Sequence, residues 1–257
     1  MRIRFSIVSA IATLWFAVPA LAQSDLPQSA MQMPMPPGQQ HQTMSMPKNP
    51  LDIDHVRDGS GTSWLPDDSP MHALMHQAGS WMLMLHGNGF LQFLKSGSSR
   101  GDQQVGSVNW IMLMAQRTLY GGQFVLHAML SAEPATVGRC GYPALLQSGE
   151  SCRGTPLHDR QHPHDLFMEL AADYRRAIND RVAIELYGGP AGEPALGPTS
   201  YPHRLSAMPN LYAPITHHWL DSSHISFGVM TGGMYGRRWK AEASIFNGRE
   251  PDDGRYN

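Results

Sequence analysis

Histidine and aspartate crowd a short stretch in the middle of this chain. Its members are His158, Asp159, His162, His164 and Asp165. Imidazole nitrogens and carboxylate oxygens are donors that zinc and Cu(II) accept. The proline between His162 and His164 fixes an extended backbone, which would put both imidazoles on one side. The stretch therefore predicts a metal site or, as the alternative, side chains that hydrogen-bond to one another and pin a loop.

A second cluster, further along the chain, has the same donors. It consists of His217, His218, Asp221 and His224. If both stretches are loops over one end of a sheet, they would form a single site for zinc or copper.

Serines beside the last histidine of that cluster raise the alternative of a lipid hydrolase. Ser222 and Ser223 precede His224 directly. Adjacent residues of a strand face opposite sides, so Ser223 and His224 would not pair as nucleophile and base. There is also no Gly-x-Ser-x-Gly elbow. We therefore expect the protein not to be an enzyme.

Methionines make a third candidate site in the stretch from residue 23 to about residue 50. The donors there are Met31, Met33, Met35, His41, Met44 and Met46. Thioethers with an occasional imidazole suit Cu(I). The stretch has too few aliphatic residues to form a core, so we expect a disordered arm. It would either present copper ligands or serve only as a linker.

The elements that must position these residues alternate apolar and polar side chains, as β-strands do. In 165–175, Leu166, Met168 and Leu170 would face one way, and Asp165, Glu169 and Asp173 the other. In 224–233, Ile225, Phe227 and Val229 would oppose His224, Ser226 and Met230. Further strands are predicted at 80–94, 106–118 (with undecided faces), 122–133, 181–188 and 238–247. These make about seven strands, each about long enough to cross a bilayer when tilted.

The connections between these strands alternate in length. Tight turns are expected at 120–122, 178–180 and 235–237, and longer loops at 96–105, 134–164 and 189–223. Bacterial outer-membrane barrels have this alternation, with apolar side chains toward lipid and polar ones toward the lumen. The fold prediction is therefore all-β, an antiparallel up-and-down transmembrane β-barrel. The odd strand number and the lack of a final strand ending in an aromatic residue suggest an incomplete, amino-terminal fragment.

Two of the predicted strands would bring soft donors into that lumen. Met82, Met84 and His86 share one face of 80–94, and His127 and Met129 share one face of 122–133. Such a row predicts either a metal site or a mixed polar lining.

The amino terminus predicts export. Arg2 and Arg4 precede an apolar run at 7–18 and small residues at 20–22, as in a cleaved signal peptide spanning residues 1–22. An arm and transition at 23–78 and the partial barrel at 79–257 would follow. His72 and His76 would share a face if 71–77 were a helical turn. With 16% charged residues and a net charge of −2, the chain has no basic surface for nucleic acid.

An oxidising compartment also guides the interpretation of the two cysteines. Cys140 and Cys152 lie in one predicted loop, so we expect a disulfide between them. A metal-binding thiolate pair is the alternative, although the Cys-x-x-Cys spacing of zinc sites is missing.

Several strings resemble a group of bacterial outer-membrane β-barrel proteins found alongside metal-resistance systems, often those for copper. They are HDRQHPHD at 158–165, GEPALGP at 192–198, HHWLD at 217–221 and RWKAEA at 238–243. FNG at 246–248 is also similar to phosphate- and carbohydrate-selective porins. The resemblance runs from about Ser80 onward. It implies a barrel in the outer membrane of a Gram-negative bacterium, with lipid and the barrel assembly machinery as partners and no settled activity or cofactor.

These features predict an outer-membrane barrel that acts as a channel or structural pore component, with a role in metal tolerance, above all of copper. The alternative is a periplasmic or surface-exposed protein that binds copper or zinc. A lipid hydrolase with its site at the barrel rim is the second alternative. Charges predicted to line the lumen are mixed in sign, so they do not identify a permeant ion.

Overall fold

Eight strands form one antiparallel sheet in the computed structural model, which describes residues 48–210, 212–213 and 225–248. They lie in the order β1 (Leu74–Ala78), β2 (Trp81–Lys95), β3 (Gln103–Leu119), β4 (Gly122–Leu130), β7 (Phe167–Ala177), β8 (Ala183–Gly192), β9 (Ser226–Gly236) and β10 (Trp239–Asn247). A separate hairpin pairs β5 (Tyr142–Cys152) with β6 (Thr155–Gln161). The helices η1 (His55–Arg57), α1 (Glu133–Thr136) and η2 (Tyr201–His203) are short. The predicted antiparallel β architecture is confirmed.

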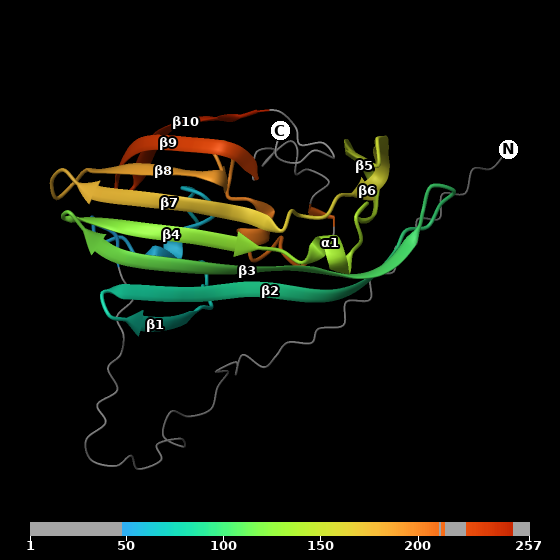
Figure 1. Ribbon diagram of the computed structural model, residues 1–257, viewed down its shortest axis with the longest axis horizontal. Helices are drawn as coiled ribbons and strands as arrows, with labels where there is room; N and C mark the ends of the chain where they lie inside the picture. Colours follow the sequence, from blue (N-terminus) through green and yellow to red (C-terminus); the bar gives the residue numbers. More distant parts are fainter. Residues whose placement is uncertain (1–47, 211, 214–224, 249–257) are drawn as a thin grey trace, which may run out of the picture.

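The strands are connected by tight turns at one end of the sheet and by longer segments at the other (Figure 1). Tight turns join β1 to β2, β3 to β4, β7 to β8 and β9 to β10. In the β3–β4 turn, Tyr120 and Gly121 both have positive φ, as a type I′ hairpin turn requires. Longer connections leave from β2, β4 and β8. No helix in the described part of the chain is long and apolar enough to cross a membrane.

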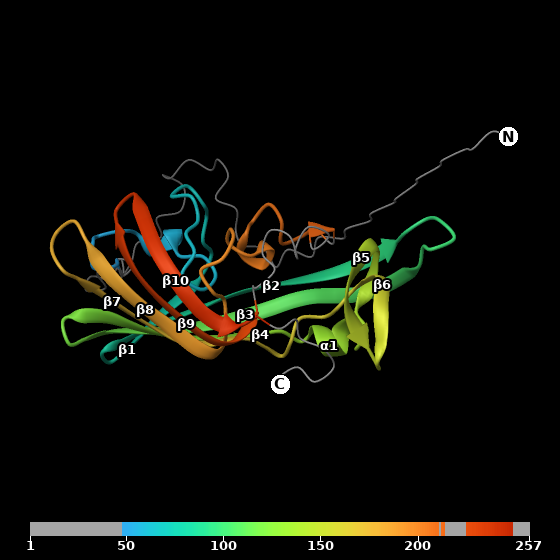
Figure 2. The ribbon, with the colours of Figure 1, turned by 90° about the horizontal axis from the view of Figure 1, so that it is seen from above.

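The large sheet is curved, and the described residues do not close it into a barrel. Figure 2 shows β7 to β10 curling upward around the segments that lie on one side of the sheet. Each edge strand has a single neighbour, since β1 pairs with β2 and β10 with β9.

Strand β1 was not predicted, and it falls in the stretch expected to be a transition. The condition for a shared helix face, a helical turn at 71–77, is not met, because residues 74–78 pair with β2 and place His76 opposite Leu83. Gly79, with φ of 60°, allows the chain to turn back directly onto β2. The sheet therefore begins at Leu74 rather than after residue 78, and His72 and His76 share no helix face.

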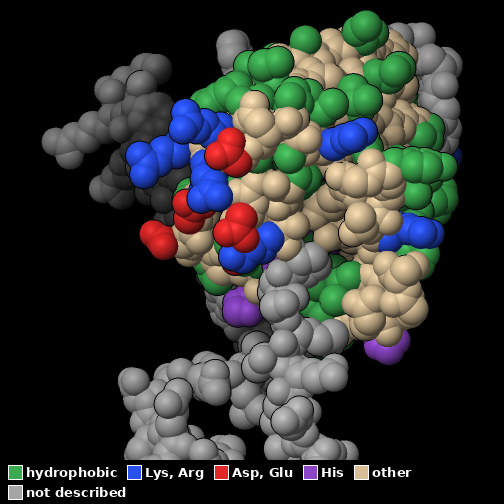
Figure 3. Space-filling model, turned by 90° about the vertical axis from the view of Figure 1, so that its left-hand side faces the viewer, with side chains coloured by type: hydrophobic (Ala, Val, Ile, Leu, Met, Phe, Trp, Pro, Cys, Tyr) green, Lys and Arg blue, Asp and Glu red, His purple; other side chains and the backbone are tan. Residues whose placement is uncertain are grey.

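Side chains of the large sheet are sorted between two faces. We call inner face the one that contacts segments 48–72 and 193–210, and outer face the opposite one. Charged and polar side chains are buried on the inner face, among them Gln123, His127, Glu169, Asp173, Arg175 and Glu185. Large apolar side chains are exposed on the outer face, among them Leu85, Leu91, Ile111, Leu113, Leu126, Leu186 and Ile245. In Figure 3, which views the end with the tight turns, charged side chains gather on one side while hydrophobic ones spread over much of the rest.

These faces agree with the predicted alternation in four strands and correct it in β7 and β9. In β7, Met168 was expected on the apolar side, but it is 4% exposed and packs with Trp110, Met112 and Met129, because the pairing with β4 skips from Glu169 to Phe167. In β9, Val229 was expected on the apolar side and Met230 opposite, but Val229 is 1% exposed and Met230 is 71% exposed. The cause is a bulge: the pairing with β10 skips from Met230 to Phe227, and Gly228 has φ of 64°. An extra residue in a strand exchanges the faces of all later residues in that strand.

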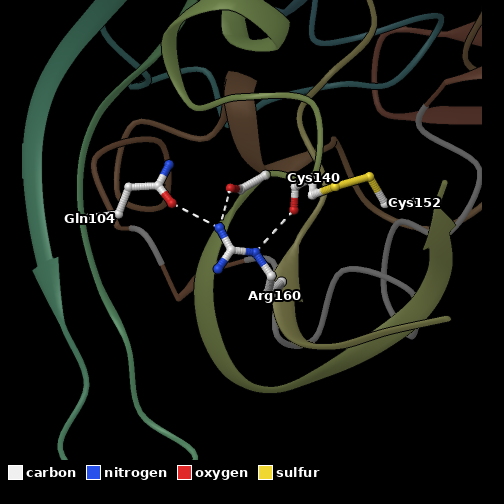
Figure 4. Close-up of a disulfide and its surroundings, with 5 residues drawn as sticks. Gln104, Cys140, Cys152 and Arg160 are labelled. Atoms are coloured by element: carbon white, nitrogen blue, oxygen red, sulfur yellow. Dashed lines mark hydrogen bonds between the residues drawn. A yellow bond between two sulfur atoms is a disulfide. The ribbon is translucent and has the colours of Figure 1, made fainter. Parts of the chain in front are cut away.

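The long connection between β4 and β7 is not a plain loop, since it contains α1 and the β5–β6 hairpin. The predicted disulfide is confirmed: Cys140 and Cys152 are bonded, with their Cα atoms 5.5 Å apart. Arg160 on β6 donates to the carbonyl oxygens of Cys140 and Gly141 and to Gln104 of β3 (Figure 4). The disulfide thus ties the hairpin to the start of its own connection, and Arg160 holds the hairpin to β3 of the large sheet.

Replacing Cys140 and Cys152 by serine should loosen this hairpin and leave the large sheet intact. A disulfide closing a loop of this size is worth about 3 kcal/mol, and the hairpin is a sheet of its own. Limited proteolysis should cut the variant in 140–161 much faster than the parent. The unfolding midpoint of the large sheet, followed by tryptophan fluorescence, should hardly change. Equal cleavage rates would contradict the prediction.

Several predictions concern residues outside the described part. These are the signal peptide at 1–22, the arm with Met31, Met33, Met35, His41, Met44 and Met46, and the cluster of His217, His218, Asp221 and His224 with the neighbouring serines Ser222 and Ser223.

Candidate functional site

A network of buried charges occupies the inner face near the tight turns. Its centre is Arg175 of β7, whose side chain is 5% exposed. The Arg175 Nε lies 2.6 Å from Asp173 and 2.7 Å from Glu185 of β8. Its Nη1 lies 3.0 Å from both carboxylate oxygens of Asp58, which comes from the segment 48–72. Arg175 therefore joins two strands of the sheet to the segment that lies against them.

A second cation extends this network to the edge strand. Lys240 of β10 forms ion pairs with Glu185 and, at 3.3 Å, with Glu242. Its Nζ also donates to the carbonyl oxygen of Thr62 at 2.5 Å. Because Lys240 and Arg175 share Glu185, one continuous network links β7, β8, β10 and the segment 48–72.

Apolar contacts reinforce the attachment of that segment. Leu51 and Ile53 are buried against Ala183 and Tyr235 of the sheet. Trp64 meets the Tyr235 ring edge-on, with centroids 5.8 Å apart. We call residues 48–72 the inner segment. It covers the inner face at the end where the tight turns lie.

Methionines and histidines line the inner face of β2, β3 and β4. Pairing across these strands places His86 opposite Met112 and Met112 opposite Met129. Two residues further along each strand, Met84 lies opposite Met114 and Met114 lies opposite His127. Met84, Met112, Met129 and His127 are all buried. The predicted row of Met82, Met84, His86, His127 and Met129 is thus one surface, and the structure adds Met112 and Met114, which lie between them.

A further histidine approaches this surface from the connection after β8. His203 of η2 stacks on Trp110, with ring centroids 4.9 Å apart. Its Nε2 lies 3.4 Å from the Met129 sulfur. Burial of the ring lowers the pKa of His203, with His86 nearby adding to the effect. The imidazole is therefore neutral at physiological pH, with a nitrogen directed at a thioether.

Of the first predicted cluster, His164 has a clear structural role. Its Nδ1 lies 2.9 Å from Glu133 of α1, and its Nε2 lies 3.0 Å from the Tyr201 hydroxyl of η2. Glu133 also accepts from the His164 backbone N–H. All three side chains are buried. They connect three segments at the end where the longer connections lie, so His164 pins loops through Glu133 and Tyr201 rather than through other members of the predicted cluster.

The other members of that cluster do not converge with His164. Asp159, on strand β6 rather than in the expected loop, forms two hydrogen bonds to Arg100 in the β2–β3 connection. The hydrogen bonds from Arg100 lower the pKa of Asp159, and a backbone N–H from Leu146 adds to this. His158 is also on β6. His162, two residues before His164, lies beside Gln161, and Asp165 is buried. The described residues contain no group of three or more His, Cys, Asp or Glu side chains that could hold a metal ion.

The sequence did not predict a role in these sites for two methionines of β3 or for two residues of the connections. Met112 and Met114 were missed because the faces of 106–118 could not be assigned, although they share the parity of Trp110. Asp58 and His203 lie in connections, where no periodicity tells which way a side chain points. Their roles depend on how segments distant in the chain pack onto the sheet.

No protein-family model, curated protein or solved structure matches this chain.

Proposed function

We propose that this chain forms the wall of an outer-membrane β-barrel in a Gram-negative bacterium, with the inner face as its lumen, and acts as a channel or pore component. The observation that carries the proposal is the inverted distribution of side chains. The same sheet buries Asp173, Arg175 and Glu185 on one face and exposes Leu113, Leu126 and Leu186 on the other. Barrel strands in outer membranes have this arrangement.

Water would be a poor environment for this outer face. A soluble sheet buries its apolar face and leaves its polar face to the solvent, because each large apolar side chain contributes roughly 1.5–3 kcal/mol on burial. Here Leu126 is 41% exposed and Leu186 is 59% exposed, on strands separated only by β7. Lipid surrounding the sheet would remove this cost without altering the polar interior.

The inner segment then lies where it would obstruct a lumen. Asp58 and Thr62 are bonded to the wall through Arg175 and Lys240, and Ser60 meets Ser200 of the opposite connection at 3.0 Å between hydroxyl oxygens. A solute could pass only if this segment moved. We therefore expect a narrow pore whose conductance depends on the contacts of the inner segment.

Planar-bilayer recording of the refolded full-length protein tests this. The variant Asp58→Asn weakens the hold of the inner segment on Arg175, while Asp173 and Glu185 still neutralise the guanidinium. It should give larger or more frequent conductance steps than the parent. The matched control is Asp68→Asn, an exposed position of the same segment, which should behave like the parent.

The proposal fails if the protein does not insert into bilayers or forms no pore. It also fails in its account of the inner segment if the Asp58 and Asp68 variants conduct alike.

A further inference from the structure

We propose that the inner face of β2 to β4 and the helix η2 form a binding site for a soft monovalent cation, Cu(I) or its analogue Ag(I). The ligands are the sulfurs of Met112 and Met129 and the Nε2 of His203. The site goes beyond the channel proposal by naming a class of ligand. It does not depend on the membrane assignment, because it is built from contacts inside the protein.

The register of the sheet brings the donors together. Met112 and Met129 are directly opposite each other on β3 and β4, and residues opposite each other in antiparallel strands have Cβ atoms about 4.5–5.5 Å apart. Both belong to one buried cluster with Trp110 and Met168. The two methionines therefore lie side by side on the inner face, and Met129 is the one whose sulfur approaches η2.

The third donor is already at a suitable separation. The Nε2 of His203 lies 3.4 Å from the Met129 sulfur. Bond lengths of about 2.0 Å to imidazole nitrogen and about 2.3 Å to sulfur, as around zinc, put two such donors roughly 3.5 Å apart at a near-tetrahedral angle. A metal ion could thus bridge these two atoms with little movement of either side chain.

Unpartnered histidines nearby argue against a purely structural role for this surface. His127 is 5% exposed, and neither of its ring nitrogens has a hydrogen-bond partner in the described structure. Its nearest carboxylate oxygen, on Glu169, is 3.8 Å away. A buried polar group without a partner costs about 1–3 kcal/mol, which a hydrophobic core built only for stability would avoid by using leucine. His86 Nε2 is likewise buried and unpartnered.

The donor types select the metal. Zinc and Cu(II) prefer several nitrogen, carboxylate or thiolate donors, whereas thioethers favour Cu(I).

The test is a titration of the refolded full-length protein in detergent with Cu(I) under reducing conditions, against a chromophoric Cu(I) chelator, and separately with Ag(I). The five methionines of the arm, Met31, Met33, Met35, Met44 and Met46, are changed to leucine throughout, so that the arm cannot supply thioethers. The variants are Met129→Leu and His203→Gln. The matched control is Met234→Leu, on β9, where the side chain is 46% exposed.

Met129→Leu and His203→Gln should each weaken binding at least about tenfold, since even loss of an outer partner of a metal ligand costs ten- to hundredfold. Met234→Leu should bind like the parent. X-ray absorption of the Cu(I) complex should show sulfur neighbours that decrease in the Met129 variant. A Met-to-Leu exchange nearly conserves volume, and urea unfolding checks that this variant folds.

Equal affinity of the Met129 and Met234 variants would overturn the proposal, as would an arm-silenced parent that binds no Cu(I) or Ag(I). Bilayer insertion of the same preparation is scored separately. Loss of metal binding and loss of pore formation are therefore distinguishable outcomes.

Discussion

Replacing Arg175 by methionine should destabilise the protein by about 3–5 kcal/mol, the range for removing one partner of a buried ion pair. The guanidinium lies between Asp173, Glu185 and Asp58. Without it, three carboxylates would share a largely water-excluded space with only Lys240 as counter-charge. Methionine fills a similar volume, so the loss would come from the charge rather than from a cavity. Urea unfolding of the refolded protein, followed by tryptophan fluorescence, measures the effect.

The matched control for this change is Arg181→Met in the β7–β8 turn, where the arginine is exposed. Surface substitutions of this kind usually stay within about 0.5 kcal/mol. The double variant Arg175→Met with Glu185→Gln should recover part of the loss, because removing a second charge of one network is not additive. If Arg175→Met unfolds at the same urea concentration as the control, the network contributes no stability.

The sequence predicted the strand residues of this network but not the residue that joins it from outside the sheet. Alternation in 165–175 and 181–188 correctly placed Asp173, Arg175 and Glu185 on one face, because a strand offers only two directions. It could not indicate that Asp58 would complete the network. Asp58 lies in a segment without periodicity, and its contact with Arg175 spans more than a hundred residues of chain.

Errors arose where one local feature changed the period or the pairing. Gly228 inserts a bulge that turns Val229 inward, and nothing in the alternation of 224–233 marks a glycine as a bulge rather than an ordinary strand residue. Similarly, His72 and His76 fit a helical spacing, yet Leu74–Ala78 gains more from pairing with β2 than a short isolated helix could offer.

The candidate metal site could be predicted only in part, for the same reasons. Met82, Met84, His86, His127 and Met129 were predicted to face the lumen, and they share one surface because β3 pairs with β2 on one side and with β4 on the other. His203 was not singled out, because its position against Met129 depends on how the connection after β8 folds back. Sequence patterns thus identified the wall of this site and missed the ligand that approaches it from a loop.

Replacing Leu113 by lysine should separate a lipid-facing outer face from a water-facing one. Leu113 is 45% exposed on β3, between Leu85 of β2 and Ala128 of β4. If lipid covers this face, lysine near the middle of the bilayer costs about 2–4 kcal/mol. If water covers it, the change should stay within about 0.5 kcal/mol. Urea unfolding from liposomes measures the difference, and folding yield into liposomes gives a second readout.

The control is Leu146→Lys on the β5–β6 hairpin, where the leucine is 72% exposed and belongs to the separate sheet. It introduces the same side chain at an exposed leucine that lies outside the large sheet, so it should be nearly neutral in liposomes. A lipid-facing outer face requires Leu113→Lys to be costly while Leu146→Lys is tolerated. Equal tolerance of both changes would show that the outer face is not in contact with lipid, and the proposal of a barrel wall would then fail.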